Sequence, residues 1–158
     1  MKFSNIKVPN KIPFTKIGFE KNQKDYDVLL EKRKEILVRL QAAREMGDLS
    51  ENGAYTAAKF ELRNTDRELR RLKYLIRFGV VTDKKGNDVV DFGSQVTIDD
   101  GREKMVFMIV SGYESNPTSS KLSSESPIGR ALLGKKEGDK ISVHSPDGII
   151  EYKLLKIE

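Results

Sequence analysis

The chain has no cysteine, no tryptophan and a single histidine among its 158 residues. Without cysteine it can form neither disulfides nor cysteine metal sites, which fits a reducing compartment. The one histidine, His144, has no evident partner for a catalytic triad, so we interpret it as a structural or surface residue. No apolar run reaches the roughly 20 residues that span a bilayer, and the basic start MKFSNIKVPNKIPF lacks the apolar segment of a secretory signal. We therefore expect a cytoplasmic protein with no membrane contact.

Hydrophobic residues make up 37% of the chain, which is little for one compact core but suits a two-helix arm that buries one stripe per helix. Two segments carry apolar residues at helical spacing. The first has Leu29, Leu30, Ile36, Leu37, Leu40 and Ala43, and the second has Tyr55, Ala58, Leu62, Thr65, Leu69, Leu72 and Ile76. This spacing predicts helices over 26–46 and 52–78. Because the turn between them is short, they should form an antiparallel hairpin with facing seams, each helix on the order of 35 Å long.

The helical spacing ends at Phe78-Gly79, and a turn-rich connector follows at 83–88. Strands are predicted at 94–98, 104–110, 140–144 and 149–157, and a polar loop with a short strand at 115–126. A short helix is predicted at 127–133, because Ser126 can cap its start and Gly134 can end it. The expected fold class is α+β: an N-terminal antiparallel α-helical coiled-coil hairpin over 1–80, then a small antiparallel β domain with one short helix over 81–158.

Positive charge is concentrated in the first half. Residues 1–80 hold 18 basic and 11 acidic residues, a balance of +7, whereas 81–158 hold 11 and 13, a balance of −2. We define as the basic stripe the five cations that each follow a seam position of the second helix: Lys59, Arg63, Arg70, Lys73 and Arg77. Such a stripe can be a solvated face, but seven basic against three acidic residues over 59–77 favour an anionic partner such as a nucleic-acid backbone.

Two carboxylates, Asp48 and Glu51, stand at the far end of the predicted hairpin. Asp-x-x-Glu before a helix is a capping-box pattern, so one interpretation is structural. The other is metal binding, although two ligands are fewer than the roughly six oxygens that Mg²⁺ takes. Both interpretations remain open from the spacing, because one oxygen can cap while others face outward.

The stretch AREMGDLSEN at 43–52, followed by Tyr55 and AAK at 57–59, resembles the tip of the Gre transcript-cleavage factors (GreA/GreB type). Pro13-x-Thr15-x-x-Gly18 resembles the family's amino-terminal entry, and SPIGRALLGK at 126–135, Gly138-Asp139 and Pro146-x-Gly148 resemble its carboxy-terminal domain. The match runs from about Ile12 to the end of the chain. The family usually has His, Glu and His where Met46, Ala54 and Thr56 stand here, while the acidic pair is retained.

The resemblance implies an FKBP-like second domain and a transcription elongation factor that enters the secondary channel of bacterial RNA polymerase. There it would stimulate cleavage of the nascent transcript in backtracked or arrested complexes, without being a stand-alone nuclease. Asp48 and Glu51 would hold a second Mg²⁺ in trans, within the polymerase active site; the isolated protein would bind none. Further expected contacts are Leu49, Ser50 and Asn52 at the tip, Lys59, Arg63 and Arg70 toward the RNA 3′ end, and Ser126, Pro127 and Ile128 for polymerase docking. We expect a monomer.

Three other functions are open to test. An inhibitory relative would occupy the same channel without cleavage, which the acidic pair disfavours. An FKBP-like chaperone or prolyl isomerase would need an aromatic-lined pocket, and the second half has few aromatic residues: Phe92, Phe107, Tyr113 and Tyr152. A plain RNA-binding module would bind free RNA with steep salt dependence. For Ser126, Pro127 and Ile128 the opening of a helix is the competing role.

Overall fold

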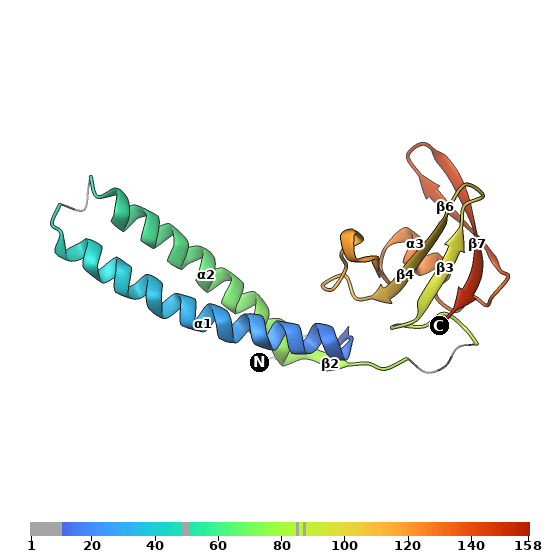
Figure 1. Cartoon of the computed structure of the whole chain (residues 1–158), viewed down its shortest axis with the longest axis horizontal. Coiled ribbons are helices and arrows are strands. Elements are labelled where there is room, and N and C mark those ends of the chain that lie inside the picture. Colours follow the sequence, from blue (N-terminus) through green and yellow to red (C-terminus); the bar gives the residue numbers. More distant parts are fainter. Residues whose placement is uncertain (1–10, 49–50, 85, 87) are drawn as a thin grey trace, which may run out of the picture. The chain divides into compact units, whose positions relative to one another are not determined.

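The protein is described by a computed structural model that covers residues 11–48, 51–84, 86 and 88–158 (Figure 1). The chain divides into two compact units. The first includes Phe19–Gly79, and the second joins Ile12–Gly18 to Val80–Glu158. Within the described ranges, no helix is both long enough and apolar enough to cross a bilayer.

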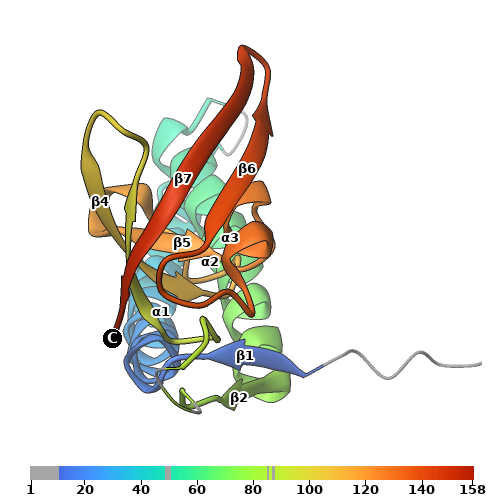
Figure 2. The same cartoon turned by 90° about the vertical axis from the view of Figure 1, so that its right-hand side faces the viewer.

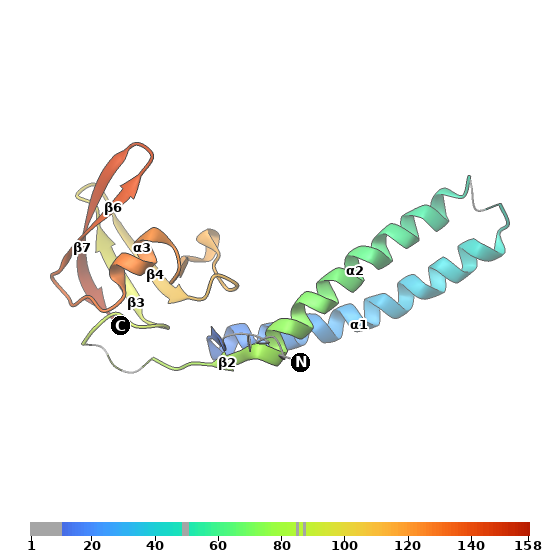
Figure 3. The same ribbon diagram turned by 180° about the vertical axis from the view of Figure 1, so that it is seen from behind.

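The first unit consists mainly of two antiparallel helices, α1 (Lys16–Glu45), which belongs to it from Phe19 onward, and α2 (Gly53–Phe78) (Figures 1 and 3). The predicted hairpin is therefore confirmed, but the predicted start of the first helix at Tyr26 is wrong. The helix begins at Lys16 because Thr15 caps it: the Gly18 N–H donates to Thr15 Oγ1 at 3.1 Å. The polar stretch 20–25 has no apolar rhythm, yet its Lys, Glu and Gln residues support a helix by propensity.

The seam between the helices is buried. Its most enclosed residues are Ile36 and Ala43 of α1 and Ala58, Thr65, Leu69, Leu72 and Leu75 of α2. The prediction for Leu37 is wrong, because Leu37 is 38% exposed while Ile36 is 0% exposed. Successive helical residues are rotated by about 100°, so the two neighbours cannot both face α2.

Ion pairs connect the two helices beside the seam. The Glu61 carboxylate of α2 pairs with Lys32 Nζ at 3.2 Å and Arg39 Nη2 at 2.7 Å, both from α1. Arg33 Nε donates to Asp66 Oδ1 at 2.6 Å. Hydrogen bonds from Lys32 and then Arg39 hold the pKa of Glu61 below its usual value of 4.5. These pairs favour one register of α1 against α2.

The second unit contains a sheet of five strands: β3 (Gln95–Asp99), β4 (Lys104–Val110), β5 (Lys121–Ser123), β6 (Lys140–Ser145) and β7 (Gly148–Ile157). Their order is β5-β4-β3-β7-β6, and Figure 1 labels β4, β3, β7 and β6. The pairs β3–β4, β3–β7 and β6–β7 are antiparallel, as predicted, whereas β5 runs parallel to β4. Residues 111–120, including the 3₁₀ helix η1 (Pro117–Ser119), carry the chain back so that β5 enters in the direction of β4.

One face of this sheet packs against α3 (Pro127–Leu132). Leu132 of α3 is buried with Val96, Ile98, Ile109 and Leu154 of the strands. At Gly129 the helix approaches β5 so closely that a Cβ would lie 2.0 Å from the backbone oxygen of Ser123. A glycine is therefore required there for the helix to reach the core.

A small sheet was not predicted: β1 (Ile12–Phe14) pairs with β2 (Gly79–Val81) (Figure 2). Phe14 is fully buried, and the Thr15 N–H and hydroxyl both donate to the Glu114 carboxylate, at 2.8 and 2.6 Å. A Cβ on Gly18 would lie 1.9 Å from Glu114 Oε1. The Pro-x-Thr-x-x-Gly motif at 13–18 thus has a structural explanation within the second unit: Thr15 binds Glu114, and Gly18 leaves room for it.

Candidate functional site

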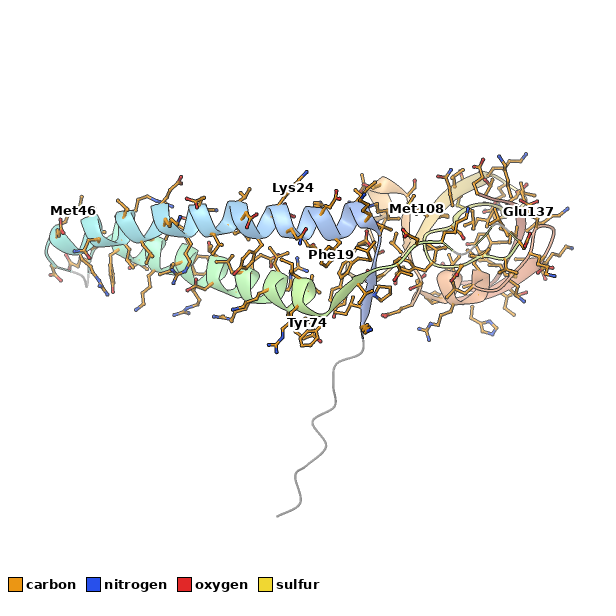
Figure 4. All side chains as sticks on the ribbon, turned by 90° about the horizontal axis from the view of Figure 1, so that it is seen from below. Phe19, Lys24, Met46, Tyr74, Met108 and Glu137 are labelled. Carbon is orange, nitrogen blue, oxygen red and sulfur yellow. The ribbon has the colours of Figure 1, made fainter. Side chains whose placement is uncertain are left out.

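The free end of the hairpin begins where α1 stops, and Figure 4 shows Met46 there, with Phe19 and Tyr74 toward the opposite end. The Met46 N–H donates to Ala43 O at 3.3 Å, and the Gly47 N–H donates to Arg44 O at 3.4 Å. Gly47 has a φ of +101°, a left-handed conformation that glycine adopts without steric cost. The helix therefore ends here because Gly47 turns the chain.

Asn52 begins α2. It is the N-cap: its Oδ1 accepts the Tyr55 N–H at 3.0 Å, and its backbone oxygen accepts the Thr56 N–H at 3.2 Å. Its Nδ2 donates to the Ala43 carbonyl of α1 at 2.7 Å. One carboxamide thus supplies a partner to a terminal carbonyl of α1 and to a terminal N–H of α2.

Asp48 and Glu51 lie between these two helix ends, and both are exposed, as the sequence predicts for the hairpin tip. The capping-box interpretation is wrong for α2, because Asn52 is its N-cap and Glu51 precedes that cap. Leu49 and Ser50, the other expected tip contacts, lie outside the described residues. Within the part of the chain that the structure describes, no three His, Cys, Asp or Glu residues gather into a metal site.

The basic stripe continues from the tip along α2. Lys59, Arg63, Arg70, Lys73 and Arg77 are all exposed. Lys59 and Arg44 each place their cation 5.9 Å from the centroid of the Tyr55 ring.

The acidic residues of 59–77 pair with cations outside the stripe. Glu61 pairs with Lys32 and Arg39, Asp66 with Arg33, and Glu68 with Arg71 at 2.6 Å. The hydrogen bond from Arg71 lowers the pKa of Glu68. The charge of the stripe is therefore presented to solvent on a helix whose own carboxylates are engaged elsewhere.

The residues expected to dock on polymerase open α3. Ser126 Oγ accepts the Gly129 N–H at 3.0 Å and donates to Ser123 O at 2.7 Å, so its capping role is confirmed. Pro127 is exposed, and Ile128 is half-buried against the core. Among these three residues, Pro127 offers the most surface to a partner.

Aromatic residues of the second unit are used in packing. Phe92 and Tyr152 are buried, and Tyr113, though exposed, has its ring 6.4 Å from that of Phe14. His144 is exposed on β6. This placement disfavours a prolyl isomerase site built from aromatic walls.

Comparisons with known proteins agree over both halves. A family profile described as "Transcription elongation factor, N-terminal" matches residues 12–81, and one described as "Transcription elongation factor, GreA/GreB, C-term" matches residues 85–158. Transcription elongation factor GreA of Nitratiruptor is 39% identical over 151 residues, covering 93% of both chains. That of Geobacillus kaustophilus is 38% identical over 152 residues, covering 92% of this chain and 96% of its own.

Among solved structures, GreA factor homolog 1 of Thermus thermophilus is similar, with 28% identity, a TM-score of 0.46 and coverage of 94% of this chain and 99% of its own. The level of identity to the GreA proteins over nearly the full length decides the assignment. The chain belongs to the GreA/GreB family of transcription elongation factors.

Proposed function

We propose that this elongation factor enters the secondary channel of bacterial RNA polymerase as a monomer and stimulates cleavage of the nascent transcript in backtracked or arrested complexes. The observation that carries the proposal is the exposed pair Asp48 and Glu51 at the tip of a two-helix arm. Because α1 has 30 residues and α2 has 26, the helices are about 45 and 39 Å long. An arm of this length can carry the two carboxylates into a deep active site.

The tip suits Mg²⁺ in donor chemistry, because this cation prefers carboxylate oxygens. It is incomplete as a site, since the described residues offer no cluster of three ligands. Asp48 as the closer ligand, with Glu51 toward the metal or the attacking water, would hold a second Mg²⁺ together with carboxylates of the polymerase. When bound, this ion supplies charge stabilisation for phosphodiester hydrolysis. On this proposal the factor alone would bind no metal and would cleave RNA only together with the polymerase.

Two other surfaces support the same function. Lys59, Arg63 and Arg70 would attract the extruded 3′ end of the RNA through its phosphates, without reading bases. Ser126, Pro127 and Ile128 would dock at the rim of the channel, with Pro127 making the contact and Ser126 holding the helix that presents it. An inhibitory channel binder needs the arm but not the acidic pair, so the pair favours cleavage over inhibition.

The test separates binding from cleavage with the variant Asp48→Asn, which keeps size and removes charge. It should fold, compete with the parent for polymerase, and stimulate RNA shortening in backtracked complexes at least tenfold less, about 1.4 kcal/mol of transition-state stabilisation. Added Mg²⁺ should restore part of the activity, and Glu51→Gln should have a smaller effect.

The matched control is Glu45→Gln, which neutralises an exposed carboxylate at the end of α1. It should cleave like the parent. Full stimulation by the double variant Asp48→Asn/Glu51→Gln would overturn the proposal, and channel occupation without any RNA shortening by the parent would favour the inhibitory function.

A further inference from the structure

The carboxamide of Asn52 joins the two ends of the tip segment 46–51. Its Nδ2 lies 2.7 Å from Ala43 O, and its Oδ1 lies 3.0 Å from the Tyr55 nitrogen. The chemistry fixes which atom is which, because a carbonyl can only accept and a backbone N–H can only donate. Ala43 is buried in the seam, so the carbonyl at one end of this bridge belongs to a well-packed residue.

We propose that Asn52 is a positioning residue, which sets the span of the tip segment and thereby places the Asp48 and Glu51 carboxylates. This inference rests on the proposed function. α1 ends at Glu45 and α2 begins at Gly53, so the bond from Asn52 to the Ala43 carbonyl in the last turn of α1 holds the two ends of the tip segment together. A displacement of about 1 Å at reacting groups can cost on the order of 10²-fold in rate, which makes such a bridge consequential.

An N-cap alone would need only an acceptor. Asp and Ser cap helices about as well as Asn, so neither Asn52→Asp nor Asn52→Ser should change the start of α2. Neither can reproduce the bridge: a carboxylate has no N–H for Ala43 O, and a serine hydroxyl is shorter. Asn52→Ala removes cap and bridge together. These three variants therefore separate a positioning role from a capping role.

The matched control is Asn116→Asp. Asn116 caps η1 in the second unit, where its Oδ1 accepts the Thr118 N–H at 3.0 Å. The substitution makes the same chemical change at a cap remote in sequence from the tip. It should leave cleavage at the parent rate.

The first readout is the concentration dependence of RNA cleavage in backtracked complexes. For Asn52→Asp and Asn52→Ser we expect the melting temperature of the parent and a maximal cleavage rate, at saturating factor, about 10- to 100-fold lower. Parent-like maximal rates for both variants would overturn the proposal. A loss confined to Asn52→Ala, in proportion to its lower melting temperature, would also overturn it in favour of capping.

The second readout does not need polymerase: amide hydrogen exchange by NMR. In Asn52→Asp the Met46 and Gly47 amides, which close the last turn of α1, should exchange faster, while the Tyr55 amide stays protected. If the parent itself stimulates no cleavage, the proposed function falls, and this exchange pattern alone then decides for or against the bridge. Equal exchange of Met46 and Gly47 in parent and variant would refute it.

Discussion

Ile36 and Leu37 are neighbours on α1 that differ in burial: Ile36 is 0% exposed in the seam, and Leu37 is 38% exposed. Replacing each with alanine therefore removes aliphatic groups of the same size from a fully buried and from a partly exposed position. Because the two substituted residues are adjacent in the sequence, a difference between the variants reports on packing in the seam.

The expected cost follows from the groups removed. Ile36→Ala deletes three buried carbons, at about 0.8 kcal/mol each, and the cavity adds to this, so the free energy of unfolding should fall by about 2–4 kcal/mol. Leu37 is 38% exposed, so Leu37→Ala removes carbons that are only partly buried and gains slightly in helix propensity, and its cost should be smaller, about 1 kcal/mol.

The assay is thermal and urea unfolding followed by far-ultraviolet circular dichroism, which reports mainly on α1 and α2. At about 4–8 °C per kcal/mol for a unit of this size, Ile36→Ala should melt at least 8 °C lower than the parent. Equal melting of the two variants, or a larger loss for Leu37→Ala, would mean that the seam is not formed as described.

Two further predictions concern charge. Charge reversal at Arg63 and Arg70 together should weaken both RNA cleavage and the dependence of cleavage on salt. The melting temperature should stay close to that of the parent, because exposed charges contribute little to stability. Equal activity of the variant and the parent across a salt series would mean that the stripe only keeps the protein soluble. The pKa of Glu61 is held below 4.5 by hydrogen bonds from Lys32 and then Arg39, so its contribution to stability is present above that value and lost as the pH falls through the lowered pKa. In the Glu61→Gln variant the melting temperature should therefore fall less steeply than in the parent as the pH is lowered into the acid range. The same dependence of melting temperature on pH in both proteins would contradict the pairing.

The elements with a long, regular apolar period could be predicted from sequence. The antiparallel hairpin, the four longer strands and the helix after Ser126 all follow from local spacing and capping residues. The first turns of α1 could not, because the polar residues of 20–25 have no period and the helix start depends on Thr15. The pairing of β1 with β2 could not be predicted from local patterns either, because it joins residues far apart in the chain.

At the tip, the exposure of Asp48 and Glu51 was predictable from their place in a short turn. The choice of N-cap was not. Asp48 and Asn52 both suit a cap by residue type, and the structure shows that Asn52 is the N-cap of α2. The second bond of Asn52 to Ala43 O is a contact between helices, which no local pattern records.

On α2, different side chains contribute to the stability of the helical hairpin and to its affinity for an anionic partner. Glu61 and Asp66 face cations of α1, while Arg63 and Arg70 point to solvent beside the same seam. The buried seam is mostly apolar and, among the described residues, carries no charged side chain, so salt weakens it little, whereas attraction between exposed cations and phosphates falls off within a Debye length of about 8 Å at physiological salt. Ionic strength can therefore tune how firmly extruded RNA is held without loosening the rod that carries Asp48 and Glu51, because different side chains of one helix perform the two tasks.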